Sequence, residues 1–319
     1  MSKQDKKELR QQIACEWLEE NYLNYGSLRH DVVTDRLQIR MPNLESLEDG
    51  SAYSLEFRGK ENWRNLTDKD INTMVCQCVA EKGVNISTNE MWTALKSDMV
   101  PAVHPLRAWL DGLRPHTADQ PDWIDFVASQ VKVKPSGEEA KGDKARGEEL
   151  WRACFKKWFV AMVASWMKDE VVNHTVLVLV GRQGIFKTTW LDKLIPPELR
   201  AYSSKLPLSG QISKDDRLRL CENGMLNIDE LDAMCGREMN IVKSLLTSTD
   251  VNERAAYGRL KERRVRLASF CASTNKREFL TDITGNRRWL PFEVESIQNP
   301  FHTIIPYERL YAQAKALVE

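Results

Sequence analysis

The stretch Gly181-Arg-Gln-Gly-Ile-Phe-Lys187-Thr188-Thr189 decides the fold of this chain. It matches all but one position of the pattern G-x-x-x-x-G-K-[ST]. In that pattern backbone N–H groups surround phosphate oxygens, the lysine reaches the β- and γ-phosphates, and Ser/Thr binds Mg²⁺. Gly181, Lys187 and Thr188 stand at the required spacing, whereas Phe186 occupies the place of the second glycine. The stretch therefore predicts a phosphate-binding loop with one departure from its pattern.

The segments on either side of this loop favour the same interpretation. Residues 174–180 form a short, β-branched apolar run, which predicts a buried central strand of a parallel sheet. Residues 188–195 have apolar residues at helical spacing and stop at two prolines, which predicts a helix. The alternative is an ordinary β–α turn in which Lys187 is simply solvated. The residues expected to contact nucleotide are Gly181, Gly184, Ile185, Phe186, Lys187, Thr188 and Thr189.

A second motif lies downstream, where the apolar run at residues 225–228 ends in Asp229 and Glu230. A carboxylate at the carboxyl end of a strand beside the phosphate loop can bind Mg²⁺, and the carboxylate after it can polarise the attacking water. We therefore expect Thr188 and Asp229 to be metal ligands and Glu230 to be catalytic. The alternative is a strand end with two solvated carboxylates.

A third apolar run, residues 267–272, predicts another buried strand, and it ends in Ser273-Thr274-Asn275. The amide of Asn275 would be placed to orient water against a γ-phosphate, although an asparagine in a β-to-loop turn is common in general. Arg287 and Arg288 then precede the apolar run at 290–294. In ring ATPases such an arginine can reach the γ-phosphate of a neighbouring subunit; the alternative is plain surface.

Several motifs between residues 171 and 294 occur in the same order as in a known family. They are V-L-V-G-R-Q-G-I-F-K-T-T-W, N-I-D-E-L-D, L-L-T-S…R-A-A-Y-G, S-T-N-K-R-E-F-L-T-D and T-G-N-R-R-W. Together they resemble the virulence-associated protein E family, which is related to superfamily 3 helicases and to phage or plasmid primase-helicases. The resemblance implies an AAA+-like, ring-forming (hexameric) core with ATP and Mg²⁺ as cofactors. It also implies action on single-stranded DNA in mobile-element replication, with room for a separate primase or replication-initiation partner.

Basic residues are concentrated between Arg254 and Arg266, although the chain as a whole has no net charge. In superfamily 3 helicases a β-hairpin in this interval projects into the ring channel, where Lys and Arg would meet phosphates and Tyr257 a base. The alternatives are a solvated basic edge, or arginines that bind the nucleotide of a neighbour. The nucleic-acid contacts expected are Arg254, Tyr257, Arg259, Lys261, Arg263, Arg264 and Arg266.

The overall organisation expected is an α/β P-loop NTPase with a parallel-sheet core at residues 171–319. Residues 1–105 mix helical and strand patterns and predict an α+β accessory domain, winged-helix-like. Residues 106–170 form a helical segment that a mobile loop interrupts at about 131–150, because this stretch is rich in Lys, Gly and Glu.

Composition bounds the class of protein further. An apolar fraction of 42% with 29% charged residues is typical of a soluble globular protein. No apolar run of about 18 residues exists, which argues against a membrane span, and the charged N-terminus lacks a signal-peptide core. A cytoplasmic location is expected.

Two functions remain open at this point. One is an ATP-driven, helicase-like motor on single-stranded DNA; the other is a nucleotide-dependent switch or scaffold ATPase that assembles on DNA or a protein partner without unwinding. Phe186 bears on the choice, because a Cβ removes the positive-φ freedom of glycine. We expect an αR-compatible backbone at Phe186, with its ring packed against the protein core and away from the phosphates.

Overall fold

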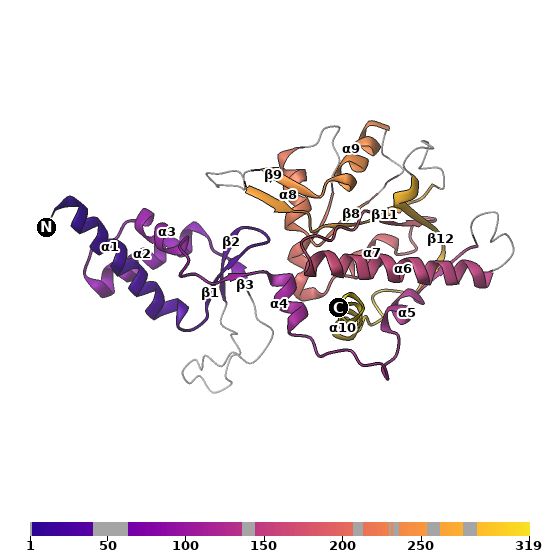
Figure 1. Cartoon of the computed structure of the whole chain (residues 1–319), viewed down its shortest axis with the longest axis horizontal. Coiled ribbons are helices and arrows are strands. Elements are labelled where there is room, and N and C mark those ends of the chain that lie inside the picture. The colour runs from indigo at the N-terminus through magenta and orange to yellow at the C-terminus, as the bar shows by residue number, and fades with distance from the viewer. Residues whose placement is uncertain are drawn as a thin grey trace. The chain divides into compact units, whose positions relative to one another are not determined.

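The computed structural model divides into two compact units, Met1–Pro105 and Leu106–Glu319. It describes residues 2–40, 63–135, 144–206, 213–229, 231, 236–253, 262–276 and 286–319. Each unit has a sheet of its own (Figure 1). Each unit also has its own buried apolar core. Among the described residues, no helix combines the length and the apolar character needed to cross a membrane.

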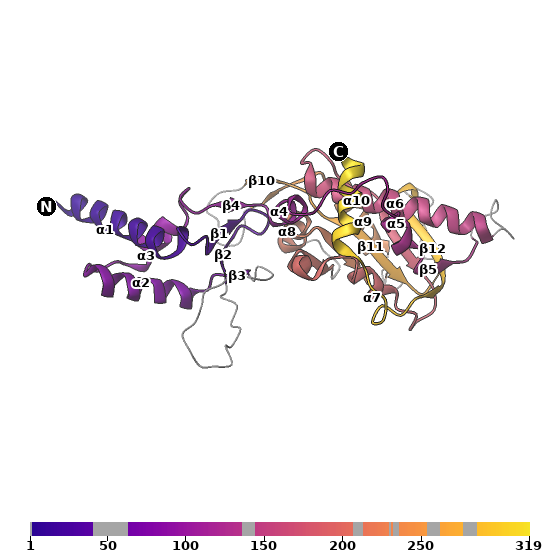
Figure 2. The same cartoon turned by 90° about the horizontal axis from the view of Figure 1, so that it is seen from below.

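In the described residues of the first unit, three α-helices pack beside a four-stranded sheet. The sheet has the order β3-β2-β1-β4, in which β1 and β4 are parallel and the other two pairs are antiparallel. Figures 1 and 2 both show α1, α2 and α3 packed against one another. The elements are α1 (Lys3–Leu18), the π-helical turn η1 (Glu19–Leu23), β1 (Leu28–Asp31), β2 (Arg36–Arg40), β3 (Trp63–Asn65), α2 (Asp68–Lys82), α3 (Thr88–Leu95) and β4 (Ala102–Val103).

The start of α2 is fixed by side chains just before and inside its first turn. Thr67 and Asp70 form a capping box, in which each side chain accepts a hydrogen bond from the other's backbone N–H. The guanidinium of Arg64 pairs with both carboxylate oxygens of Asp70 at 2.6 Å. The hydrogen bonds from Arg64 hold the pKa of Asp70 far below its usual range, against the opposing effect of burial.

The second unit is built on a six-stranded sheet of order β5-β12-β6-β11-β8-β7. The β5–β12 pair is antiparallel, and the four other pairs are parallel. The elements are α4 (Pro105–Asp111), α5 (Trp123–Ala128), β5 (Val131–Val133), α6 (Lys144–Met167), β6 (Val176–Val180), α7 (Lys187–Asp192), η3 (Pro197–Tyr202), β7 (Ser203–Lys205), α8 (Lys214–Glu222), β8 (Met225–Ile228), α9 (Gly236–Thr247), β9 (Asp250–Glu253), β10 (Glu262–Val265), β11 (Ser269–Thr274), η5 (Asn286–Arg288), β12 (Trp289–Ile297) and α10 (Tyr307–Val318).

Helices cover both faces of this sheet, as a parallel sheet requires. All five residues of β6 are buried, and Val176, Val178 and Val180 pack with the apolar faces of α8 and α9. On the other side α6 carries large aromatic side chains, and Trp151 contacts both Trp190 of α7 and Phe292 of β12. In Figure 1, α9 accordingly lies above the strands, and α5 and α10 lie below them. This burial explains why the run at residues 174–180 reads as a central strand.

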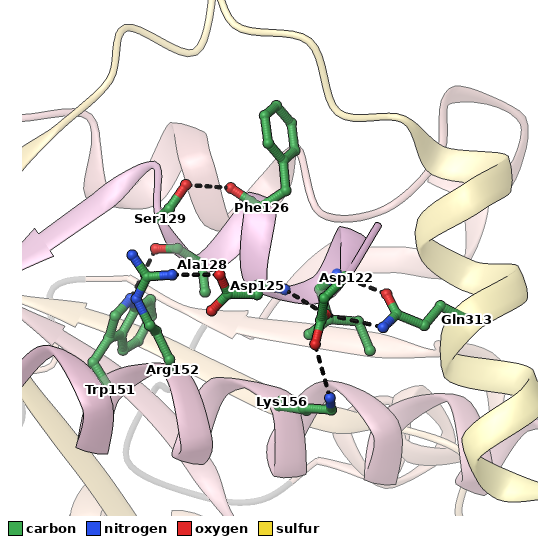
Figure 3. Close-up of polar contacts among 10 residues, drawn as sticks. Asp122, Asp125, Phe126, Ala128, Ser129, Trp151, Arg152, Lys156 and Gln313 are labelled. Carbon is green, nitrogen blue, oxygen red and sulfur yellow. Dashed lines mark hydrogen bonds and ion pairs between the residues drawn. The ribbon is translucent and has the colours of Figure 1, made fainter. Parts of the chain in front are cut away.

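Polar contacts join α5, α6 and α10 at one end of this layer (Figure 3). Asp122 caps α5, and its carboxylate also accepts hydrogen bonds from Gln313 Nε2 at 2.9 Å and Lys156 Nζ at 3.0 Å. Trp151 Nε1 donates to the carbonyl of Ala128 at 2.9 Å. These contacts join α6 and α10 to α5 on this side of the sheet.

The expected organisation of residues 106–170 is partly wrong. Residues 131–150 were expected to form a loop, but Val131–Val133 form the edge strand β5, and α6 already begins at Lys144. The two valines of β5 are buried while Lys132 is exposed, and the strand gains its place only by pairing with β12. The stretch therefore belongs to the sheet of the second unit and is not a purely helical segment.

Candidate nucleotide and metal site at the carboxyl edge of the sheet

Three neighbouring parallel strands end at the same edge of the sheet. Thr274 of β11 pairs with Val180 of β6, and Ala272 pairs with Ile228 of β8. Consequently the residues that follow these strands, Gly181, Asp229 and Asn275, leave the sheet side by side.

The direction of the connections also marks this edge. From β6 the chain leads to β7 at one edge of the sheet, whereas from β11 it leads to β12 on the opposite side of β6. Adjacent strands whose connections run in opposite directions leave a crevice at their carboxyl ends, where open α/β sheets bind ligands.

The loop between β6 and α7 has two residues with left-handed backbone conformation. Gly184 has φ +85°, and Phe186 has φ +67°. Gly181 is restricted in another way, because a Cβ there would lie 3.0 Å from Ile185 Cδ1 and 3.2 Å from the carbonyl oxygen of Val294. The loop thus needs glycine at residue 181 for space and at residue 184 for conformation.

The αR-compatible backbone expected at Phe186 is wrong. Its φ of +67° and ψ of 17° are those that glycine would supply at this position, so the phenylalanine keeps the turn and bears its strain. The ring does not enter the buried core either. It meets Phe301 edge to face at a centroid distance of 6.2 Å, and Phe301 is 67% exposed.

Lys187, the first residue of α7, is buried although it is charged. Its Nζ donates to the carbonyl of Gly181 at 2.7 Å, to that of Arg182 at 2.8 Å, and to Oδ1 of Asn275 at 3.1 Å. The ammonium is therefore held between its own loop and the end of β11. Such carbonyl and amide acceptors are ones that phosphate oxygens can replace, because the charge-assisted bond to an anion is the stronger one.

Oxygen atoms gather next to this lysine. Thr188 Oγ1 and Ser273 Oγ each donate to Asp229 Oδ1 at 2.9 Å, and the two hydroxyls lie 3.0 Å apart. Lys205 Nζ donates to the other oxygen, Asp229 Oδ2, at 2.8 Å. Burial raises the pKa of Asp229, but the hydrogen bonds from Lys205, Ser273 and Thr188 outweigh it and hold the pKa below its usual value.

The chemistry of these donors fits a hard divalent cation. Mg²⁺ prefers oxygen ligands and is commonly held by one or two carboxylates together with substrate phosphates. Thr188, Asp229 and Ser273 offer two hydroxyls and one carboxylate of this kind. Within the described part of the chain, no three His, Cys, Asp or Glu side chains cluster as an all-protein metal site would need.

Lys205 and Ser273 are site residues that the sequence patterns did not single out. Ser273 lies in the polar end of β11, two residues before Asn275, so its hydroxyl could have been found by its place at the strand end. Lys205 carries no such signal. It ends a three-residue edge strand, Ser-Ser-Lys, whose position depends on pairing with β8.

Arg287 and Arg288 lie at the other edge of the sheet. They belong to η5, which leads directly into Trp289, and Trp289 pairs with Val176 at the amino end of β6. The five residues of β6 separate the two edges by about 16 Å, at roughly 3.3 Å per residue. The two arginines therefore cannot reach Lys187 within the same chain through a direct contact.

The expected basic hairpin is present in part. Strands β9 and β10 pair antiparallel, with Arg264 opposite Val251, and Arg263 is 76% exposed while it pairs with Asp250 at 2.6 Å. Arg264 is mostly buried and reaches Glu222 at 3.3 Å. Five residues with an expected role lie outside the described residues. Glu230 is expected to polarise water, and the expected nucleic-acid contacts are Arg254, Tyr257, Arg259 and Lys261.

Arg266 corrects the expectation of a nucleic-acid contact. Its side chain is completely buried, and its guanidinium donates to five backbone carbonyls at 2.7–3.2 Å. These carbonyls belong to Asn173, Leu245, Leu246, Ser248 and Ala268. Burial lowers the pKa of the guanidinium to about 9. Arg266 is a structural residue that joins the end of α9 to the strands.

Fold and site together define an α/β protein with a mostly parallel sheet and a polar site at the carboxyl edge of its parallel strands. Residues 143–319 match the family described as the virulence-associated protein E-like domain, and this match spans more than half of the chain. The protein belongs to this family.

Solved structures similar to this chain include apo structures of the C-terminal region of NrS-1. One of residues 305–718 has a TM-score of 0.48 at 12% identity and covers 95% of this chain and 67% of that one. Two A-form structures of the region each have a TM-score of 0.46 at 12% identity. They cover 95% and 93% of this chain and 67% and 66% of theirs. No curated protein matches the chain.

Proposed function

We propose that the chain is a P-loop ATPase with an AAA+-like core that forms a ring and acts as a motor on single-stranded DNA in phage or mobile-element replication. The observation that carries the ATPase part is the meeting of Lys187, Thr188 and Asp229 at the carboxyl edge of adjacent parallel strands. A buried ammonium beside a hydroxyl–carboxylate pair is the equipment that phosphoryl transfer needs, because catalysis there is mostly positioning and charge neutralisation.

Each site residue then has a distinct task. With nucleotide bound, Lys187 would exchange its carbonyl acceptors for phosphate oxygens, and Thr188 and Asp229 would hold the accompanying Mg²⁺, which would neutralise charge on the phosphates. Asn275 already contacts the lysine at 3.1 Å, so its amide is well situated to orient a water near the terminal phosphate. Glu230 follows Asp229 directly and is proposed as the group that polarises this water.

The arginines at the amino edge support an assembly in which two chains share one site. Arg287 and Arg288 are about 16 Å from the carboxyl edge by the length of β6, so they could act only on the nucleotide of a neighbouring copy. Such sharing makes hydrolysis depend on ring formation.

Contact with DNA is assigned to the β9–β10 hairpin. Arg263 is its exposed basic residue in the described part of the strands, and a guanidinium there can bind a phosphate once it leaves Asp250. Arg266 has no part in this contact, because its side chain is completely buried and bound to backbone carbonyls.

The test is ATP binding and ATP turnover, each measured with and without single-stranded DNA, on the wild type and on Lys187→Ala. A motor shows DNA-stimulated turnover that Lys187→Ala abolishes, whereas ATP binding without turnover identifies a nucleotide-dependent switch. Lys134→Ala is the matched control, since it removes a lysine that is half exposed and pairs with Glu293 on β12. A wild type that binds no ATP refutes the proposal.

A further inference from the structure

Lys205 contacts the candidate metal site from β7, a strand that no local sequence pattern predicts. It is the last residue of β7, and it pairs with Asn227, two residues before Asp229. Its side chain is 59% exposed, and its Nζ lies 2.8 Å from Asp229 Oδ2. The lysine therefore stands at the outer side of the site, opposite the loop that carries Lys187.

The two oxygens of Asp229 have different kinds of partner. Oδ1 accepts hydrogen bonds from the hydroxyls of Thr188 and Ser273, whereas Oδ2 accepts from the ammonium of Lys205. A hydroxyl both donates and accepts, so it can turn a lone pair toward a cation without leaving its place. An ammonium has donors only and carries a positive charge, so it cannot do so.

A cation on Asp229 thus faces a competitor inside the protein. Lys205 neutralises the same carboxylate that a divalent cation would use, and the two positive charges repel each other at contact distance. The exposure of the lysine side chain gives it room to swing into solvent, so the competition does not require any strand to move.

We propose that Lys205 is a displaceable counter-ion of Asp229 that competes with Mg²⁺ and thereby raises the Mg²⁺ concentration at which the site loads. This inference rests on the proposed function, since it concerns the metal that accompanies the nucleotide. It adds a regulatory residue, Lys205, to that site.

The size of the effect follows from the exposure of the pair. Ion pairs between exposed side chains are weak, so loss of the lysine should strengthen apparent metal binding about two- to fivefold. Lys205→Met keeps the apolar stem and removes the charge, and it should show this gain. Lys205→Arg keeps the charge and should bind metal as the wild type does.

The experiment is a titration with Mn²⁺, a paramagnetic substitute for Mg²⁺, monitored by electron paramagnetic resonance on the full chain in the presence of saturating ADP. The expected order of Mn²⁺ affinity is Lys205→Met above wild type, with Lys205→Arg and the control Lys134→Met equal to wild type. Asp229→Asn should lose most of the Mn²⁺ binding, which ties the signal to this carboxylate.

The outcomes separate this inference from the proposed function. If the wild type binds neither ADP nor Mn²⁺, the proposed nucleotide site fails, and the inference fails with it. If the wild type binds both and Lys205→Met titrates like the wild type, only the counter-ion role is refuted. An equal gain in Lys134→Met would also refute it, because the effect would then come from net charge alone.

Discussion

The ammonium of Lys187 lies 3.1 Å from the side-chain oxygen of Asn275, although 88 positions separate the two residues in the chain. The contact exists because β6 and β11 are neighbours that end at the same edge. Lys187 is fixed by its own loop on one side and by the end of β11 on the other. A change at the end of β6 or at the end of β11 would therefore alter the surroundings of the same ammonium, that of Lys187.

The left-handed backbone at Phe186 predicts an unusual order of variant stabilities. Phe186→Gly removes strain of about 1–2 kcal/mol but loses the ring contact with Phe301, so its unfolding free energy should stay close to that of the wild type. Phe186→Ala keeps the strain and loses the contact, so it should be less stable than Phe186→Gly by roughly 1 kcal/mol. Chemical denaturation of both variants measures the difference.

Thr189, which lies in α7, provides the control for this pair. There glycine should be less stable than alanine, by about 1 kcal/mol, because the backbone is helical. If alanine is the better residue at both positions, the left-handed conformation of Phe186 is wrong.

Removal of the buried Arg266 guanidinium should strongly destabilise the second unit. Arg266→Met leaves five backbone carbonyls without their charged donor, which we expect to cost about 3 kcal/mol or more. Arg264→Met, two residues earlier, on β10, removes the contact with Glu222 at 3.3 Å and leaves the five backbone carbonyls bound, so it should cost less, roughly 1 kcal/mol. Thermal unfolding of the two variants decides; equal melting temperatures would contradict the structural role of Arg266.

The Arg64–Asp70 pair predicts a pH dependence in the first unit. Because the pKa of Asp70 is depressed in the folded state, its contribution to stability is complete above the ordinary carboxyl pKa. That contribution is lost progressively as the pH falls toward the lower folded value. Hydrogen exchange of α2 amides in wild type and Asp70→Asn should differ at pH 6 to 7 and converge in acid.

The matched change for this measurement is Asp68→Asn. It removes the same charge from the first turn of α2 while Arg64 and Asp70 stay paired, so its effect on exchange should be smaller. A difference between wild type and Asp70→Asn that grows toward acid would contradict the assigned direction.

In the described part of the hairpin, Arg263 is the residue whose loss should weaken DNA binding without harming the fold. Arg263→Ala should lower affinity for single-stranded DNA of any sequence and reduce the slope of log affinity against log salt by about 0.7, as loss of one phosphate contact does. Fluorescence anisotropy at several salt concentrations measures both. An unchanged slope, with Lys134→Ala behaving identically, would remove Arg263 from the DNA interface.

Sharing of one site between two chains predicts complementation. The double variant Arg287→Ala/Arg288→Ala should bind ATP but should not hydrolyse it on its own. Mixed with Lys187→Ala, it should regain part of the turnover, because the two defects lie at opposite edges of the sheet. A mixture of Lys187→Ala with Asp229→Asn should stay inactive, since both changes lie at the same edge. Turnover in neither mixture would argue against arginines acting across the interface.

The strands that carry the site could be predicted because their sequences are short and mostly apolar. β6, β8 and β11 are buried along their whole length, and Gly181, Asp229 and Asn275 follow directly after them. Local patterns of this kind need no knowledge of distant segments.

Other features depend on pairing partners that the local sequence does not contain. The polar sequence of β7, which carries Lys205, indicates a loop when it is taken alone, and Val131–Val133 are predicted to be part of a loop. Both segments are strands because they pair with β8 and β12, respectively. The basic stretch around Arg266 predicts a nucleic-acid contact, yet its acceptors come from α9, from the segment before β6 and from Ala268, just before β11.

The conformation of Phe186 has a consequence for how such loops are recognised. The turn before α7 requires left-handed φ and ψ angles at residue 186. The identity of the side chain there is secondary, as long as its ring can pack against a neighbour such as Phe301. A search written in amino-acid letters that insists on glycine at this position passes over the chain. A search written in backbone angles finds it, and would also find relatives that use other residues there.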